Sequence, residues 1–228
     1  MPAARHDGVT TTGPNPGSPP RRGRPPRATR EQIIDAAVAL LRQAPDEPLT
    51  MARVASSVGL TPMALYRHFK DRDELMDEVV GQILMERNAA IPREGPWQDQ
   101  LRAWILGGLD HLVPCAQVVQ VVFAGGSARW VHDAATLVRI LDQAGLADEQ
   151  LAEMQVWIAL SVGGYVMAES SRRQGPNTPE VYAALAHLEP EDADRLAALI
   201  PQIDRAFDQM HERFADRLIQ TVEAAAPS

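Results

Sequence analysis

Capping signals at the starts of short apolar runs are the feature that most constrains how the amino-terminal third of this chain folds. Thr29 followed by Gln32 has the pattern of a capping box, in which the two side chains bond to free backbone N–H groups. Thr50, Thr61 and Asp71 each precede a further apolar run, in the position that N-cap residues occupy. Because apolar side chains follow at three- and four-residue spacing, the sequence predicts four consecutive helices here.

The second and third of these predicted helices form a helix-turn-helix pattern. Residues 50–69 contain two short capped segments joined by a turn at Gly59, where a left-handed backbone conformation is needed. The apolar residues that suit the inner face of this unit are Val54, Ala55, Val58, Leu60, Leu65 and Phe69. In a helix-turn-helix the second helix enters the major groove, so the segment that starts at Thr61 is the candidate DNA-reading helix.

The remainder of the chain also has helical periodicity. We expect helices at residues 97–112, 114–123, 127–143, 148–173, 179–188 and 190–222. No segment alternates convincingly between apolar and polar residues with a period of two. The predicted fold class is therefore all-α, with a three-helix DNA-binding domain that contains the helix-turn-helix and a larger helical domain after it.

Charge is distributed unevenly along the chain, whose net charge is −8. Residues 1–75 carry a net charge of +3 and residues 76–228 one of −11, the asymmetry expected when one part meets a polyanion. Residues 1–28 are rich in Pro, Gly, Thr and Arg, so we expect a flexible basic arm. Such an arm can follow a phosphate backbone or enter a minor groove, and a solubilising tail is the alternative. The arginines concerned are Arg21, Arg22, Arg24 and Arg27.

The run Thr-Pro-Met-Ala-Leu-Tyr-Arg-His-Phe-Lys at residues 61–70, followed by Asp-Arg-Asp-Glu-Leu at 71–75, resembles the recognition helix and the start of the fourth helix in the TetR family of bacterial transcriptional regulators. The match covers roughly residues 29–80. The helical remainder resembles the ligand-binding domains of the subgroup that contains the tetracycline repressor. The resemblance implies a homodimer, a palindromic DNA operator, and repression relieved by a small-molecule effector.

The same resemblance assigns residues to DNA contacts. It implies that Thr50 and Tyr66 hold phosphates and that Lys70 anchors the backbone just past the recognition helix. Ala52 stands where the family often has arginine, which leaves Arg53 or the arm to supply that contact. Outside the arm, the predicted DNA-binding residues are Thr50, Arg53, Thr61, Pro62, Met63, Ala64, Tyr66, Arg67, His68 and Lys70.

Large and adaptable side chains on the later helices suit the lining of a mostly apolar cavity with a few polar groups. The candidate ligand-binding residues are Trp104, Asp110, His111, Phe123, Trp130, Met154, Trp157 and Tyr165. Ordinary core packing is the alternative for any one of them. Gly163 and Gly164 interrupt an apolar predicted helix, which indicates close approach of a neighbouring backbone or room for a ligand.

The predicted helices at 148–173 and 190–222 have more apolar surface than the core of one subunit needs. We expect them to pack against their two-fold copies as a four-helix bundle. The apolar residues that recur at helical spacing in the second of these helices are Leu196, Leu199, Ile200, Ile203, Phe207, Met210, Phe214 and Leu218. The predicted domains are therefore the arm at 1–28, the helix-turn-helix DNA-binding domain at 29–75, and the ligand-binding and dimerisation domain at 76–228.

Other classes of protein fit the sequence less well. No catalytic motif is present, and we expect neither enzymatic activity nor a cofactor or metal. Cys115 is interpreted as a small buried apolar residue. The first residues resemble no secretory signal, and the apolar uncharged run at residues 154–168 is shorter than the roughly 18 apolar residues of a membrane span, so we expect a cytoplasmic protein without a span.

The favoured interpretation is a dimeric DNA-binding transcriptional regulator that a small molecule releases from its operator. Two alternatives remain open on the sequence. One is a DNA-binding repressor that responds to no ligand. The other is an all-helical enzyme or adaptor that contains a helix-turn-helix-like hairpin.

Overall fold

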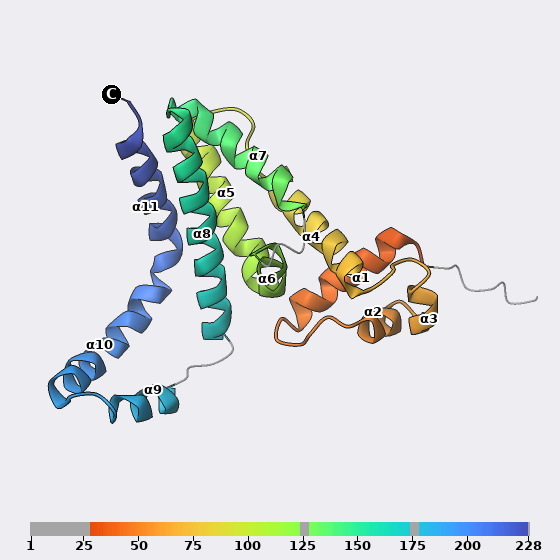
Figure 1. Cartoon of the computed structure of the whole chain (residues 1–228), viewed down its shortest axis with the longest axis horizontal. Coiled ribbons are helices and arrows are strands. Elements are labelled where there is room, and N and C mark those ends of the chain that lie inside the picture. Colours follow the sequence, from red (N-terminus) through yellow and green to blue (C-terminus); the bar gives the residue numbers. More distant parts are fainter. Residues whose placement is uncertain (1–27, 124–127, 174–177, 228) are drawn as a thin grey trace, which may run out of the picture.

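The computed structural model describes residues 28–123, 128–173 and 178–227, and every regular element within those ranges is a helix (Figure 1). The amino-terminal helices are α1 Arg30–Gln43, α2 Met51–Ser57, α3 Pro62–Leu65 and α4 Arg72–Ala89. The later elements are α5 Trp97–Leu112, the 3₁₀ turn η1 Val113–Cys115, α6 Ala116–Phe123, α7 Trp130–Leu141, the 3₁₀ turn η2 Asp142–Ala144, α8 Asp148–Arg173, α9 Thr178–Leu185, α10 Pro190–Asp208 and α11 Met210–Ala225. The predicted all-α fold class is confirmed.

The capping residues begin the first four helices as the sequence predicts. Thr29 accepts a hydrogen bond from the backbone N–H of Gln32, whose side chain accepts one from the N–H of Thr29, so the capping box is complete. Thr50, Thr61 and Asp71 each accept a hydrogen bond from the backbone N–H three residues further on. Helices as short as α2 and α3 are unstable alone, so these caps and the packing beneath them determine where each helix lies.

The turn between α2 and α3 depends on Gly59, whose φ of 67° lies in the left-handed region that favours glycine. The turn brings Val54 of α2 and Leu65 of α3 into the core, where both side chains are completely buried. Phe69 is buried directly after α3. The inner face predicted for the helix-turn-helix is therefore present in the structure.

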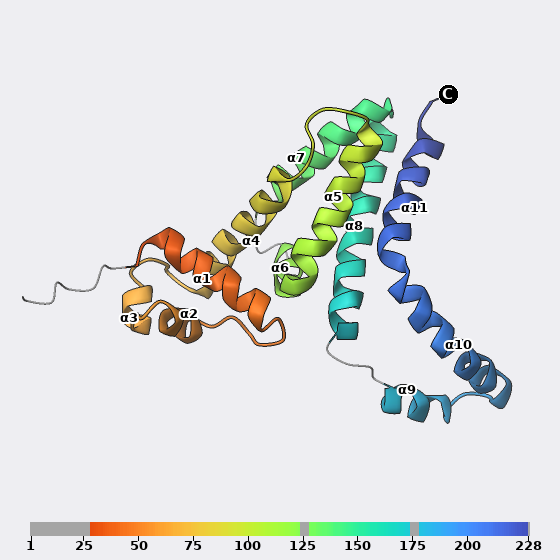
Figure 2. The same ribbon diagram turned by 180° about the vertical axis from the view of Figure 1, so that it is seen from behind.

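Helix α4 leads from the three-helix unit into the larger domain without interruption (Figures 1 and 2). It packs against α1, α5, α6 and α7. Polar contacts to α1 run along most of its length, from Glu74 to Glu86. The buried side chains Val79, Val80 and Ile83 lie in its middle turns. The boundary predicted after residue 75 therefore falls inside one continuous helix.

Helix α5 lies at the centre of the larger domain. It packs against α4, α7, α8 and α11, and its buried residues include Leu101, Ile105 and Leu109. Helices α8 and α11 lie side by side along one edge of the molecule (Figure 1). The larger domain is thus a bundle built around α5.

The prediction of a single last helix at 190–222 is wrong, because the chain forms two helices, α10 and α11, that meet at Gln209. Neither glycine nor proline stands at this break, and the apolar spacing continues through it, so periodicity alone could not reveal it. The physical difference is packing. Helix α11 packs against α5 and α8, whereas no residue of α10 is buried and α10 projects away from the bundle with α9 (Figure 2).

Two segments, Trp97–Phe123 and Asp148–Arg173, are long and apolar enough to cross a membrane when judged by length and composition alone. The first is interrupted by η1 and is half buried within the protein. Core helices of soluble proteins have the same composition. The expectation that the chain lacks a membrane span therefore stays a prediction.

We predict that Gly59→Ala destabilises the protein by about 1 to 2 kcal/mol, because an L-residue is strained in the left-handed conformation. Urea unfolding monitored by circular dichroism measures the change. Gly107→Ala is the control, since a Cβ there would lie 3.5 Å from the Arg87 side chain, an ordinary contact, and alanine favours helix by about 0.5 to 1 kcal/mol. Equal stability of the two variants would contradict the prediction.

Candidate nucleic-acid interface and interior cavity

The outer surface of α3 carries the side chains predicted to face a DNA groove. Met63 is 74% exposed, whereas Leu65, two residues on, is completely buried. Thr61 and Pro62 are exposed, and Ala64 is partly exposed. This short helix thus presents one face to the protein core and the opposite face to solvent.

Exposed polar groups surround this face in positions where phosphates could bind. The side chain of Lys70 is 87% exposed, and Tyr66 and Arg67 are also exposed. The hydroxyl oxygens of Thr50 and Thr61 accept the capping hydrogen bonds, and each hydroxyl keeps its own hydrogen for donation. All of these groups can therefore meet an anionic backbone.

Arg53 is held by its own chain. Its guanidinium donates to the backbone carbonyls of Glu47 and Pro48, at 3.1 and 2.8 Å, and forms an ion pair with the Glu47 carboxylate at 2.8 Å. A phosphate contact by Arg53 requires it to exchange at least one of these partners. The predicted arm arginines, Arg21, Arg22, Arg24 and Arg27, lie outside the described residues.

Arg30 at the start of α1 fixes the chain after α3, a role that sequence reasoning missed. Its guanidinium donates to the His68 carbonyl, forms ion pairs with Glu74 and Glu78 at 2.8 and 3.1 Å, and lies 4.2 Å from the centre of the Phe69 ring. Hydrogen bonds from the Lys70 N–H and from Arg30 lower the pKa of Glu74. Arg30 thus holds α1, the end of the recognition segment and α4 in one arrangement.

A cavity of about 440 Å³ lies within the larger domain, bounded by α4, α5, α6, α7 and α8. The residues that line it are Leu84, Arg87, Trp104, Leu112, Val118, Val119, Val122, Phe123, Trp130, Asp133, Ala134, Leu137, Gln155, Val156, Ala159, Leu160, Val162 and Gly163. Its walls are thus mostly apolar, with few polar side chains, which is the composition of small-molecule sites.

Three of the predicted ligand-binding residues, Trp104, Phe123 and Trp130, line this cavity, and the other five lie elsewhere. Asp110 faces His211 of α11 at 3.7 Å, and His111 is hydrogen-bonded to the Gly107 carbonyl at 2.8 Å. Tyr165 packs against Phe214, with ring centres 4.9 Å apart. Met154 and Trp157 line a separate pocket between α8 and α11.

The polar centre of the cavity wall is a pair that sequence reasoning missed, Arg87 of α4 and Asp133 of α7. Arg87 is 1% exposed and forms an ion pair with Asp133. Its guanidinium lies 4.3 Å from the centre of the Trp104 ring. Burial lowers the pKa of Arg87 to about 9, so it stays protonated at neutral pH. The sequence signal was an arginine three and four residues after the apolar Leu84 and Ile83, on the buried stripe of α4.

Gly163 allows one cavity residue to approach α8. A Cβ on Gly163 would overlap the ring of Phe123 at the end of α6, whereas a Cβ on Gly164 would meet no atom within 4 Å. The close approach predicted for this glycine pair thus occurs at Gly163, and the neighbour is a side chain instead of a backbone. The aromatic wall of the cavity depends on this missing side chain.

Polar contacts join α6 to the loop before α2, and the start of α7 to α4. The Gln117 amide of α6 donates to the carbonyls of Pro45 and Glu47, both at 3.0 Å, and accepts from the N–H of Leu49 at 3.3 Å. Arg129, just before α7, forms ion pairs with Asp77 and Glu78 of α4 at 3.0 and 2.8 Å.

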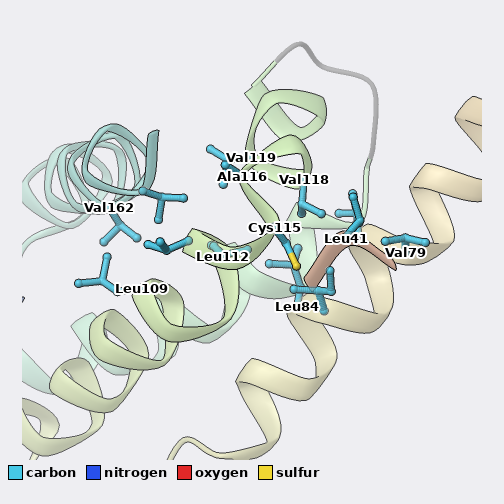
Figure 3. Packing of buried hydrophobic residues seen from close by; sticks show 14 of the residues in the cluster. Leu41, Val79, Leu84, Leu109, Leu112, Cys115, Ala116, Val118, Val119 and Val162 are labelled. Atoms are coloured by element: carbon cyan, nitrogen blue, oxygen red, sulfur yellow. The ribbon is translucent and has the colours of Figure 1, made fainter. Parts of the chain in front are cut away.

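An apolar cluster lies where α1, α4, η1 and α6 meet. Leu41 of α1, Leu84 of α4 and Val118 of α6 gather around Cys115 (Figure 3). Cys115 is buried, which raises the pKa of its thiol and confirms the prediction of a small apolar residue. Across the described ranges, no three His, Cys, Asp or Glu residues are close enough together to hold a metal ion.

The geometry defines a helical protein with an exposed helix-turn-helix and an open, mostly apolar cavity, whose walls include the exposed side chains of Phe123 and Trp130. Residues 33–79 match the family described as bacterial regulatory proteins, tetR family. The HTH-type transcriptional repressor DrrR1 of Streptomyces coeruleorubidus is 27% identical over 183 residues, 74% of this chain but 65% of that repressor, less than two thirds of its length. The HTH-type transcriptional regulator BetI of Stenotrophomonas maltophilia is 31% identical over 183 residues, 68% of this chain and 92% of that protein.

A solved structure of BioQ with its natural double-stranded DNA operator superposes with a TM-score of 0.55 and 29% identity, covering 64% of this chain and 90% of that one. With the match to BetI extending over most of both proteins, this chain belongs to the TetR family of bacterial regulators.

Proposed function

We propose that this protein is a cytoplasmic transcriptional repressor, without enzymatic activity, that a small molecule releases from a palindromic DNA operator. The observation that carries the proposal is the continuous helix α4, which packs on α1, the helix that contacts α2 of the helix-turn-helix, and lines the cavity through Leu84 and Arg87. The similarity to BioQ, solved with double-stranded DNA, supports DNA as the partner. Selection of bound DNA from a random pool tests this, because a dimeric reader selects a two-fold symmetric sequence.

The proposed DNA contacts divide into positioning and reading. Lys70→Ala should weaken binding to all sequences about equally and reduce the salt slope by about 1, because one phosphate contact is lost. His68→Ala and Met63→Ala should instead change the preferred bases. Operator titrations at several salt concentrations, repeated with shuffled half-sites, separate the two effects. If Lys70→Ala instead relaxed the base preference and left the salt slope unchanged, Lys70 would read bases and the assignment of a phosphate contact to it would be wrong.

The apolar faces of α8 and α10 support a homodimer. Trp157 and Leu160 of α8 are each 53% exposed, and Leu196 and Ile203 of α10 are exposed too. These faces are too apolar for a surface that meets only water, and a second copy of the chain would cover them. Two residues expected at this interface pack within their own chain instead, since Leu218 is buried and Phe214 stacks with Tyr165.

We predict that Trp157→Glu converts the dimer to a monomer and lowers operator affinity by at least about 100-fold, because half of the base contacts are lost with the second subunit. Sedimentation velocity and operator titration measure the two effects. Met85→Glu is the control, since Met85 is an apolar residue on α4 that is 71% exposed. A dimeric Trp157→Glu protein with full operator affinity would require another interface.

Gln117 is the proposed connection between the cavity and the helix-turn-helix unit. Helix α6 lines the cavity through Val118 and Val119, while Gln117 is hydrogen-bonded to the loop before α2. We predict that Gln117→Leu increases hydrogen exchange at the Leu49 N–H by about tenfold or more and weakens operator binding, because that donor loses its acceptor. Gln120→Leu, an exposed change on the same helix, is the control. Unchanged exchange at Leu49 would remove Gln117 from the connection.

A further inference from the structure

Three buried polar atoms in the cavity wall have no hydrogen-bond partner among the described residues: the donors Arg87 Nε and Trp104 Nε1, and the acceptor Asp133 Oδ1, which forms the ion pair with Arg87 Nη2. Arg87 and Trp104 both line the cavity, and the guanidinium stacks on the indole ring at 4.3 Å. Buried donors are nearly always satisfied in folded proteins. Asp133 Oδ1 is already ion-paired with Arg87 Nη2, so the two unpartnered donors indicate a further acceptor that the described residues do not supply.

The charges of the wall favour a negative acceptor. Among the described residues that line the cavity, only Arg87 and Asp133 are charged, and they are paired through Arg87 Nη2. The guanidinium also reaches Asn88 Oδ1 through Nη2, at a long 3.5 Å, and Nε has no partner. A carboxylate or sulfonate can bind side-on to a guanidinium through Nε and one terminal nitrogen. A cationic ligand would instead lie beside a buried arginine and leave both donors unsatisfied.

The remaining walls specify an apolar, ring-containing body. The aromatic side chains of Phe123 and Trp130 lie on α6 and α7, and aliphatic side chains from α4, α6 and α8 complete the walls. A volume of about 440 Å³ accommodates two or three fused rings. Because Gly163 has no Cβ, the Phe123 ring can lie directly against α8.

We propose that the effector is an aromatic molecule with an acidic oxyanion, which binds between Arg87 and Trp104 and competes with Asp133 for the guanidinium. The inference rests on the proposed function only in taking the cavity to be a ligand site. Asp133 lies in the first turn of α7, four residues after Arg129, which holds Asp77 and Glu78 of α4. When the anion of the ligand replaces the Asp133 carboxylate at Arg87, α7 loses a contact with α4, the helix that connects the cavity to the DNA-binding unit.

The test uses two dyes that differ by one anion, 8-anilinonaphthalene-1-sulfonate and N-phenyl-1-naphthylamine, whose fluorescence rises in apolar cavities. The full-length protein should bind both. The double variant Arg87→Met/Asp133→Asn, which leaves no buried charge unpaired, should lose about tenfold or more of its affinity for the sulfonate, because charge-assisted hydrogen bonds are lost. Its affinity for the neutral dye should change less than about twofold, since the apolar walls remain. Asp133→Asn alone should bind the sulfonate more tightly.

Ala134→Trp locates the dyes, because an indole at this lining position fills the cavity and should abolish both signals. If both dyes bind there but the double variant weakens them equally or not at all, the anion proposal is overturned while the cavity remains a ligand site. If neither dye binds, or Ala134→Trp has no effect, the cavity as a ligand site fails as well. Binding of the selected operator, measured separately, distinguishes that failure from failure of DNA recognition.

Discussion

The burial of α4 on two sides at once is the constraint on which the rest of the structure depends. It is covered by α1 and by the larger domain's α5, α6 and α7, so one apolar core continues from the DNA-binding unit into the larger domain. A helix cannot stretch, and its internal hydrogen bonds resist bending, so a displacement at one end must appear at the other. The ion pairs at Arg30 and Arg129 attach its first turns to α1 and to the approach to α7. Separate domains joined by a flexible linker would not have this property.

Much of the DNA-binding unit could be predicted from the sequence because its signals are local. Caps at Thr29, Thr50, Thr61 and Asp71 act within three residues of themselves, and the left-handed turn at Gly59 needs only its own lack of a side chain. The bounds of α5 and α8 also followed from periodicity. The division between α10 and α11 did not, because it arises from which segment packs against α5 and not from any residue near Gln209.

The candidate cavity could be predicted only in part for a related reason. Trp104, Phe123 and Trp130 were found because large apolar side chains on predicted buried helices are evident in a sequence. Arg87 and Asp133 were missed because charged residues are assigned to the surface by default, and their 46-residue separation hides the pairing. His111 and Asp110 were expected at the cavity as polar groups on α5, yet they face the Gly107 carbonyl and α11. Which side of a helix a polar residue occupies is decided by its neighbours in space.

Gln117 hydrogen-bonds to the loop before α2 entirely through main-chain atoms of that loop, the carbonyls of Pro45 and Glu47 and the N–H of Leu49. These hydrogen bonds do not depend on which side chains the loop and the following helices carry. The residues that determine the preferred DNA sequence can therefore be replaced, by mutation or by grafting residues 61–68 from a relative. The Gln117 hydrogen bonds that connect this unit to the cavity would be retained. Recognition of DNA and response to a ligand are in this sense separable traits of one chain.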